Sequence, residues 1–281
     1  MGANRLSGRA NVKAPSQASN RRLLEVHRAL IPVALIAEAV ETLGDLLGAA
    51  GAPREIELDQ RVTALAVSDR RRLGAVYDAM RETAVFRSIV TCEPLLAAAR
   101  AATGARRLHS PFQHCVFRMD LAGESWRGFG WHQDYPYNFL SEDFVTAWLP
   151  LTPAGPHNGS IDAAPTASDR IYPVQIRFKR DASSASLGTR DAFICERFHA
   201  AFEAEATKLE LDPGDVALFH NRLVHRSGRN PGPRHRYSIQ ARFGDLLADE
   251  IAARDWRNRR SDGFDAFKQL HPDLVEYEEA S

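Results

Sequence analysis

The stretch Phe144-Val145-Thr146-Ala147-Trp148-Leu149-Pro150-Leu151 is a short run of β-forming residues, and the turn cluster Pro153-Ala154-Gly155-Pro156 follows it. Similar runs recur after Leu108, at Phe112–Met119, Ile171–Phe178, Val216–Phe219 and Tyr237–Phe243. Short strands with such turn residues between them favour a jelly-roll sandwich or barrel. We therefore predict a mainly β fold with flanking helices, whose cupin-like, double-stranded β-helix core covers about residues 108–245.

Helical patterns surround this core. The spacing of apolar residues predicts a helix over Leu30–Leu47, and Ser68-Asp69 has the composition of an N-cap for a helix that reaches about Val85. A third helix is expected over Glu93–Thr103, where Gly104 would end it. Alternation over Glu55–Leu65 predicts a strand between the first two helices. Further helices are expected over Asp191–Thr207 and about 262–280.

These segments predict one domain over residues 25–281, in which a helical layer of about residues 27–104 packs on the β core. Residues 1–24 are rich in Ser, Asn, Gly and Pro and contain basic residues but no acid before Glu25. This composition is typical of a disordered basic arm. The sequence does not indicate the oligomeric state.

Charge and composition exclude several classes of protein. Lys plus Arg and Asp plus Glu both total 36, so no overall basic field for nucleic acid is expected. The most apolar stretch, Ala29–Val40, is too short to span a membrane. The chain has only three cysteines, Cys92, Cys115 and Cys195, so we expect free thiols and a reducing, cytoplasmic setting. The expected partner is a small-molecule substrate.

A candidate metal site lies in Trp131-His132-Gln133-Asp134. In an extended segment residues two apart point to the same side, so His132 and Asp134 can share one metal ion. His225 is the candidate for the third ligand, whereas His220 is interpreted as a strand-end residue. Two imidazoles and one carboxylate form the facial triad of non-haem iron(II) oxygenases, which leaves positions open for a 2-oxo acid and O₂.

Arg236 is a candidate anchor for such a 2-oxo acid. It follows His225 by eleven positions, at the start of a β-rich run. A guanidinium group matches a carboxylate with two parallel hydrogen bonds. The hydroxyl of Ser227 can contact the same carboxylate. The pattern therefore predicts a 2-oxoglutarate site.

These residues belong to a longer set of ordered blocks. The set comprises His132-Gln133-Asp134, Thr146-Ala147-Trp148, Asn158-Gly159-Ser160, Pro213-Gly214-Asp215-Val216 with Phe219-His220, His225-Arg226-Ser227-Gly228, and Arg236. In order and spacing it resembles the phytanoyl-CoA dioxygenase (PhyH) family of Fe(II)- and 2-oxoglutarate-dependent oxygenases over about residues 108–245. Pro165-Thr166-Ala167-Ser168 departs from the Pro-Gly-Ser-His found in many family members. In the family this segment lies near the mouth of the site, so the departure concerns the substrate.

The resemblance implies a role for each matching residue. His132, Asp134 and His225 would hold Fe(II), and Arg236 with Ser227 would bind the distal carboxylate of 2-oxoglutarate. Trp148 would line the cosubstrate pocket, and Gln113 would supply an amide from an upstream strand. Because Asp134 is a carboxylate, where halogenating relatives carry Gly or Ala, hydroxylation is favoured over halogenation.

The implied activity is hydroxylation of an unactivated C–H bond of a small molecule, with release of succinate and CO₂. Two alternatives remain open at this point. One is a metal-dependent hydrolase or isomerase on a cupin-like barrel, in which Zn²⁺ activates water. The other is a non-catalytic jelly-roll binding module. The residues that follow Asp134, among them Tyr135, Tyr137, Asn138 and Phe139, can either face the substrate or pack against the barrel rim.

Overall fold

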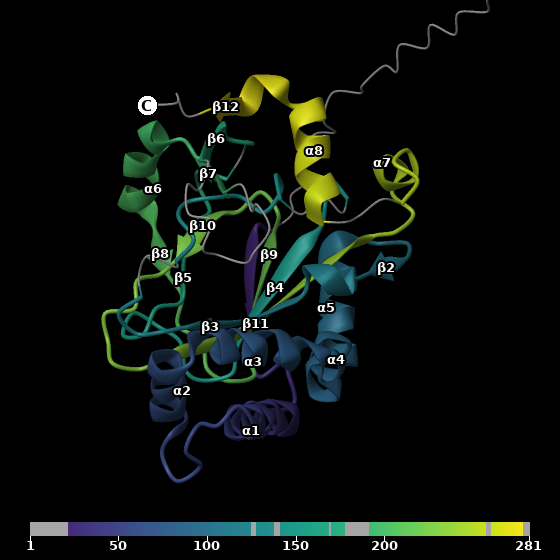
Figure 1. Ribbon diagram of the computed structural model, residues 1–281. Coiled ribbons are helices and arrows are strands. Elements are labelled where there is room, and N and C mark those ends of the chain that lie inside the picture. Colours follow the sequence, from purple (N-terminus) through teal and green to yellow (C-terminus); the bar gives the residue numbers. More distant parts are fainter. Residues whose placement is uncertain are drawn as a thin grey trace, which may run out of the picture.

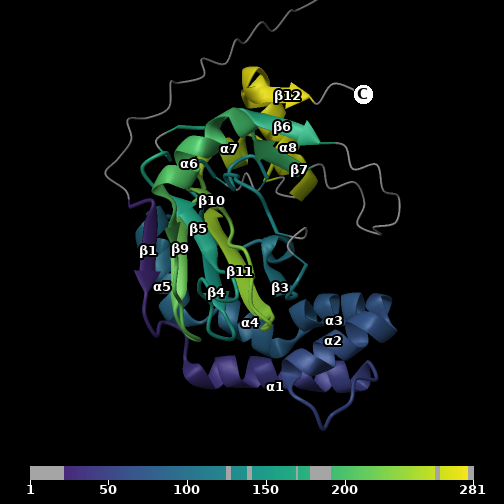
Figure 2. The same cartoon turned by 90° about the vertical axis from the view of Figure 1, so that its left-hand side faces the viewer.

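A layer of helices lies beneath the strands in the computed structural model (Figures 1 and 2). The structure describes residues 22–124, 128–137, 141–168, 170–177, 191–256 and 260–277. The N-terminal helices are α1 (Val33–Ala49), α2 (Leu58–Ser68), α3 (Arg70–Glu82), α4 (Ala84–Val90) and α5 (Glu93–Thr103). Both views place α1 to α4 on the same side of the strands.

Local signals explain the ends of these helices. The Asp69 side chain accepts a hydrogen bond from the backbone N–H of Arg72 and so caps α3, as expected. Gly104 ends α5 in the left-handed conformation, with φ of 63°. The strand predicted over Glu55–Leu65 is wrong, because α2 covers most of it. Glu57 and Gln60 form a capping box there, and burial of Val62 and Leu65 follows the helical spacing.

The largest sheet is antiparallel and carries the strands that surround the candidate site. Its order is β1-β9-β4-β11-β2, and β3 also pairs with β11. The strands are β1 (Leu24–His27), β2 (Leu108–His109), β3 (Val116–Asp120), β4 (Val145–Pro150), β9 (Val216–His220) and β11 (Arg236–Asp245). The runs predicted around 144–151, 216–219 and 237–243 are therefore strands for most of their length, whereas the run 112–119 begins with a 3₁₀ turn and becomes a strand only from Val116.

The two faces of β11 have opposite character. Tyr237, Ile239, Ala241 and Phe243 belong to the core shared with the helices. The alternate residues Arg236, Ser238, Gln240 and Arg242 lie on the other face, because successive side chains of a strand point in opposite directions. β11 thus turns polar side chains away from the helical layer, and among them Arg242 lies beside Asp134 of the candidate site.

Two smaller sheets complete the β structure. The first has the order β10-β5-β8 and the second the order β12-β6-β7. A cluster of buried side chains joins Trp148 and Phe219 of the large sheet to Ile161 and Ala163 of the first small sheet. These opposed sheets form the predicted double-stranded β-helix core. The strands are β5 (Ile161–Ala164), β6 (Val174–Arg177), β7 (Asp191–Ile194), β8 (Thr207–Lys208), β10 (Val224–Ser227) and β12 (Val275–Tyr277).

Two predicted helices differ from the observed elements. The helix expected over Asp191–Thr207 begins later, because β7 occupies Asp191–Ile194 and pairs with β6. The helix expected over about 262–280 ends at Leu270, since Pro272 follows and β12 pairs with β6 in parallel. The remaining helices are α6 (His199–Glu205), α7 (Asp249–Ala252) and α8 (Arg260–Leu270), and the 3₁₀ turns are η1 (Phe112–His114), η3 (Glu196–Phe198) and η4 (Pro272–Leu274).

Other expectations concern the termini, membranes and thiols. β1 begins at Leu24, and residues 1–21 of the predicted arm lie outside the described residues. In the part of the chain that the structure describes, no helix has both the length and the apolarity needed to cross a bilayer. Cys92, Cys115 and Cys195 are free, as predicted.

Candidate metal and cosubstrate site

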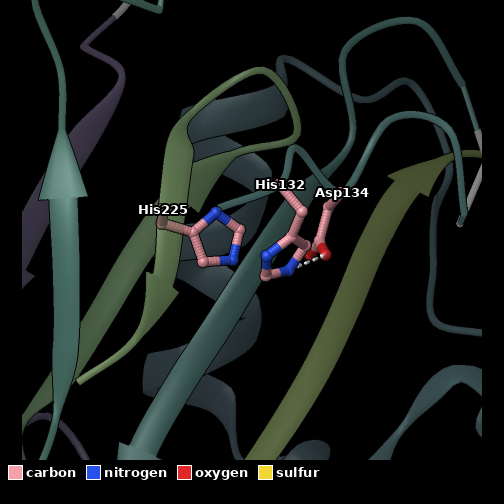
Figure 3. A group of neighbouring side chains, drawn as sticks. All are labelled: His132, Asp134 and His225. Atoms are coloured by element: carbon pink, nitrogen blue, oxygen red, sulfur yellow. Dashed lines mark ion pairs between the residues drawn. The ribbon is translucent and has the colours of Figure 1, made fainter. Parts of the chain in front are cut away.

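The structure brings His132, Asp134 and His225 together. Each offers one ligand atom, and these atoms all lie within 4.8 Å of one another. Figure 3 shows the three side chains side by side, with a dashed line between His132 Nε2 and Asp134 Oδ1, which are 3.7 Å apart. His225 lies on β10, whereas His132 and Asp134 lie in the extended segment that precedes β4.

A pair of backbone hydrogen bonds fixes the relative position of the two histidines. The N–H of His132 donates to the carbonyl of His225 at 2.9 Å, and the N–H of His225 donates to the carbonyl of His132 at 3.0 Å. Their rings lie 4.1 Å apart between centroids. This isolated β-bridge explains how two distant parts of the chain supply ligands to one point.

The imidazoles are oriented and uncharged. Nδ1 of His132 lies 2.8 Å from the carbonyl oxygen of Gly130, and Nδ1 of His225 lies 2.9 Å from that of Leu223. Each Nδ1–H donates to its carbonyl, so each Nε2 keeps its lone pair for a metal ion. Burial lowers the pKa of His132 to about 3, with a further contribution from His225. Burial also lowers the pKa of His225.

Asp134 is buried but ionised. Burial alone would raise its pKa, but the charge of Arg242 and a hydrogen bond from Thr146 hold it below the ordinary value. Thr146 Oγ1 donates to Oδ2 at 2.5 Å, and Nε of Arg242 lies 3.5 Å from the same oxygen. The roles of Arg242 and Thr146 were not predicted from the sequence. Two signals were available: Thr146 belongs to the block Thr146-Ala147-Trp148, and Arg242 shares a strand face with Arg236.

The predicted cosubstrate residues Arg236 and Ser227 line one cavity of about 270 Å³. Arg236 is 4% exposed, its Nη1 donates to the carbonyl of Ser160 at 2.9 Å, and its guanidinium lies 6.0 Å from the centroid of the Trp148 ring. Ser227 Oγ accepts a hydrogen bond from the backbone N–H of Phe129 at 3.0 Å. Trp148 thus lies beside Arg236, but it is not among the residues that line this cavity.

Asp120, which was not predicted as a site residue, holds Arg236 in place. Its Oδ2 accepts hydrogen bonds from Nη2 of Arg236 at 2.9 Å and from Nε at 3.3 Å. The expectation for Gln113 does not fit this geometry. Gln113 is exposed and lies in η1, before β3 begins opposite Gln240, whereas Asp120 stands opposite Arg236 at the far end of β3. The register of β3 therefore separates Gln113 from Arg236.

Of the two tyrosines that follow Asp134, one packs against a helix and the other lies beside the candidate site. Tyr135 is buried against Phe267 of α8, and its hydroxyl lies 3.3 Å from Nε2 of His271. The ring of Tyr137 lies 6.0 Å from that of His132. Tyr135 therefore packs at the rim, while Tyr137 faces the candidate site. Asn138 and Phe139 lie outside the described residues.

His220 is engaged away from the site. Its Nε2 lies 3.2 Å from Oδ1 of Asp143, and its Nδ1 accepts a hydrogen bond from the backbone N–H of Arg222 at 3.3 Å. Two neutral imidazoles with free Nε2 atoms and one ionised carboxylate remain at the centre. This donor set fits a divalent first-row ion such as Fe(II). The Arg236 guanidinium in the adjoining cavity fits the carboxylate of a 2-oxo acid.

The comparison with family models identifies the protein at the level of family. The model for the phytanoyl-CoA dioxygenase (PhyH) family matches residues 28–238. The chain belongs to this family. The predicted class is therefore confirmed: the protein is an Fe(II)- and 2-oxoglutarate-dependent dioxygenase. Among curated proteins, none matches the chain significantly.

Several solved structures share the fold of this chain. The epimerase SnoN, in complex with Fe³⁺, α-ketoglutarate and nogalamycin RO, is 18% identical, with a TM-score of 0.54 over 80% of each chain. AviO1 from Streptomyces viridochromogenes is 18% identical, with a TM-score of 0.51 over 81% of this chain and 92% of its own. EctD from S. alaskensis is 16% identical, with a TM-score of 0.52 over 80% of this chain and 74% of its own.

Proposed function

We propose that this dioxygenase hydroxylates an unactivated C–H bond of a small-molecule substrate and releases succinate and CO₂. His132, Asp134 and His225 hold Fe(II) in this proposal, and Arg236 with Ser227 binds the distal carboxylate of 2-oxoglutarate. The observation that carries it is the convergence of three buried ligand atoms within 4.8 Å, next to a cavity that contains a buried arginine.

Each residue has a defined task. The carbonyl oxygens of Gly130 and Leu223 accept hydrogen bonds from the Nδ1–H groups of His132 and His225. Each imidazole is thereby oriented with its Nε2 lone pair available to the metal ion. Arg236 fixes one end of the cosubstrate by charge-assisted hydrogen bonds. When bound, Fe(II) and 2-oxoglutarate supply the activation of O₂ and the oxidising power for the C–H bond. The protein positions that bond and keeps water away from the site.

An anaerobic titration tests the binding half of this proposal. Fe(II) and then 2-oxoglutarate are added to metal-free protein, and the weak visible charge-transfer band of the chelate is recorded. We expect a band in the wild type, no metal retention in His132→Ala, and a weaker cosubstrate affinity in Arg236→Ala. Arg229→Ala is the matched control, since Arg229 lines the same cavity but is exposed. A wild-type protein that binds metal and shows no band would refute the proposal.

A turnover experiment tests the reaction itself. Incubation with ¹⁸O₂ and a panel of small molecules should yield ¹⁸O-labelled succinate and a product heavier by one labelled oxygen. SnoN is named an epimerase, and an epimerised product would keep the mass of its substrate. Labelled succinate together with a product of unchanged mass would therefore support the assignment of Fe(II) and 2-oxoglutarate as cofactors, but it would exclude hydroxylation as the reaction.

A further inference from the structure

The two oxygens of the Asp134 carboxylate have different surroundings. Oδ1 is the oxygen near His132, 3.7 Å from its Nε2. Oδ2 accepts the hydrogen bond from Thr146 Oγ1 at 2.5 Å and lies 3.5 Å from Nε of Arg242. Asp134 is 3% exposed, so water does not compete strongly for either oxygen. The carboxylate is therefore held by Oδ2, while Oδ1 lies near His132.

The groups that hold Oδ2 are themselves fixed. Thr146 lies on β4 directly opposite Arg242 on β11, so the strand register brings the two side chains together. Nη1 of Arg242 donates to the carbonyl of His114 at 2.6 Å, and Nη2 donates to Oε1 of Gln240 at 3.1 Å. Nε is the remaining nitrogen; it is buried and lies 3.5 Å from Oδ2, so it attracts that oxygen by charge without forming a hydrogen bond to it.

We infer that Thr146 and Arg242 are positioning residues that keep Oδ2 of Asp134 from binding the metal ion, so that this carboxylate binds through Oδ1 alone. The inference rests on the proposed function, because it assigns Asp134 to the metal. Its consequence concerns the number of coordination positions that the metal ion keeps for other ligands. An octahedral ion with three protein atoms keeps three open positions, enough for a bidentate 2-oxo acid and O₂. A carboxylate that bound through both oxygens would remove one of them.

The test is Thr146→Val, which keeps the β-branched shape and removes the hydroxyl donor. Two dissociation constants are measured anaerobically: that of Co(II) alone, and that of 2-oxoglutarate for the Co(II)-loaded protein. We expect the constant for 2-oxoglutarate to rise about tenfold or more, since released Oδ2 competes for its position, while Co(II) binds at least as tightly as in the wild type.

Two controls separate positioning from general support of the fold. Thr146→Ser retains the hydroxyl and should restore the wild-type constants. Thr103→Val makes the same change at a buried threonine of α5, whose hydroxyl bonds to the carbonyl of Ala99, and should alter neither constant. Unchanged constants in Thr146→Val, or a loss of Co(II) affinity without a specific loss of 2-oxoglutarate, would overturn the inference.

A measurement on the unaltered protein covers the case in which Thr146→Val does not fold. The infrared difference between metal-loaded and metal-free protein reports the splitting of the carboxylate stretches, which is larger for one bound oxygen than for two. A small splitting would overturn the inference. If Co(II) binds and 2-oxoglutarate does not, the proposed function fails, yet this spectrum still decides how Asp134 binds the metal.

Discussion

Asp120 and Arg236 face each other across the β3–β11 pair and form an ion pair, with 2.9 Å between Oδ2 and Nη2. The same carboxylate also pairs with Arg118, whose Nη2 lies 2.5 Å from Oδ1. Burial would raise the pKa of Asp120, but the two guanidinium groups hold it well below its ordinary value. One carboxylate therefore serves two largely buried arginines, and one of them is the proposed anchor of the cosubstrate.

Asp120→Asn should destabilise the protein and increase the rise in Tm that 2-oxoglutarate causes. Removing one partner of a buried ion pair costs about 3–5 kcal/mol. The dianion then supplies the missing negative charge, so it should bind the variant more tightly and raise Tm by more than it does in the wild type. The measurement is Tm with and without saturating 2-oxoglutarate, in the presence of Co(II).

Asp215→Asn provides the matched control for that experiment. Asp215 also pairs with an arginine, Arg28, but it does not line the cavity. Its loss should lower Tm without enlarging the shift that 2-oxoglutarate causes. An Asp120→Asn protein that responds like the control would show that Asp120 does not influence the cosubstrate site.

Glu203 of α6 connects the segments that carry the two histidines. It accepts a hydrogen bond from Nε1 of Trp131, which precedes His132, and it pairs with Arg226, which follows His225. The Arg226 guanidinium also lies 4.5 Å from the centroid of the Trp131 ring. Trp131, Arg226 and Glu203 thus connect the two segments that carry the candidate ligands His132 and His225.

Glu203→Gln should reduce metal affinity by about tenfold, in line with other groups that orient metal ligands. Its effect on the free energy of unfolding should be small, because the side chain of Glu203 is half exposed. Titration with Co(II) measures the first quantity and urea unfolding the second. Glu205→Gln makes the same charge change on the same helix, where the carboxylate accepts the N–H of Ala167, and should leave the affinity unchanged.

Gly159→Ala should damage the cosubstrate site as well as stability. Gly159 has φ of 78°, and an added Cβ would lie 2.7 Å from the carbonyl oxygen of Gly228 and 2.9 Å from Nη1 of Arg236. We expect a loss of more than about 1–2 kcal/mol of unfolding free energy, together with weaker 2-oxoglutarate binding. Gly104→Ala separates the two causes, since φ is 63° there but nothing lies within 4 Å. Gly104→Ala should lose unfolding free energy through backbone strain but bind 2-oxoglutarate with wild-type affinity.

The stability contributed by Asp215 should depend on pH. Burial would raise its pKa, but backbone N–H groups of Ala29 and Asp212 and the charge of Arg28 lower it below the ordinary value of 3.8. A group with a lowered pKa in the folded state contributes stability that is fully present above its unfolded pKa and is lost as pH falls toward the folded pKa. The difference in unfolding free energy between wild type and Asp215→Asn should therefore be larger at pH 7 than at pH 3. A constant difference across this range would contradict the assignment.

Parts of the fold and site that depend on local spacing were predictable from the sequence. The helix over Glu93–Thr103 was predicted with its observed bounds, because Gly104 allows the left-handed conformation that ends it. His132 and Asp134 were paired from their spacing of two in an extended segment. His225 and Arg236 were found from the order of motifs along the chain.

The sequence by itself therefore determined the β core, the helical layer and the three candidate ligands, since periodicity and short spacings act within one segment. Tertiary structure alone decided which residues support them. Arg242 and Thr146 lie side by side at Asp134 because β4 and β11 pair in one register. Asp120 meets Arg236 because β3 and β11 pair in another. Strand register arises from packing between segments far apart in the chain, and a shift of one residue would turn each of these side chains to the opposite face.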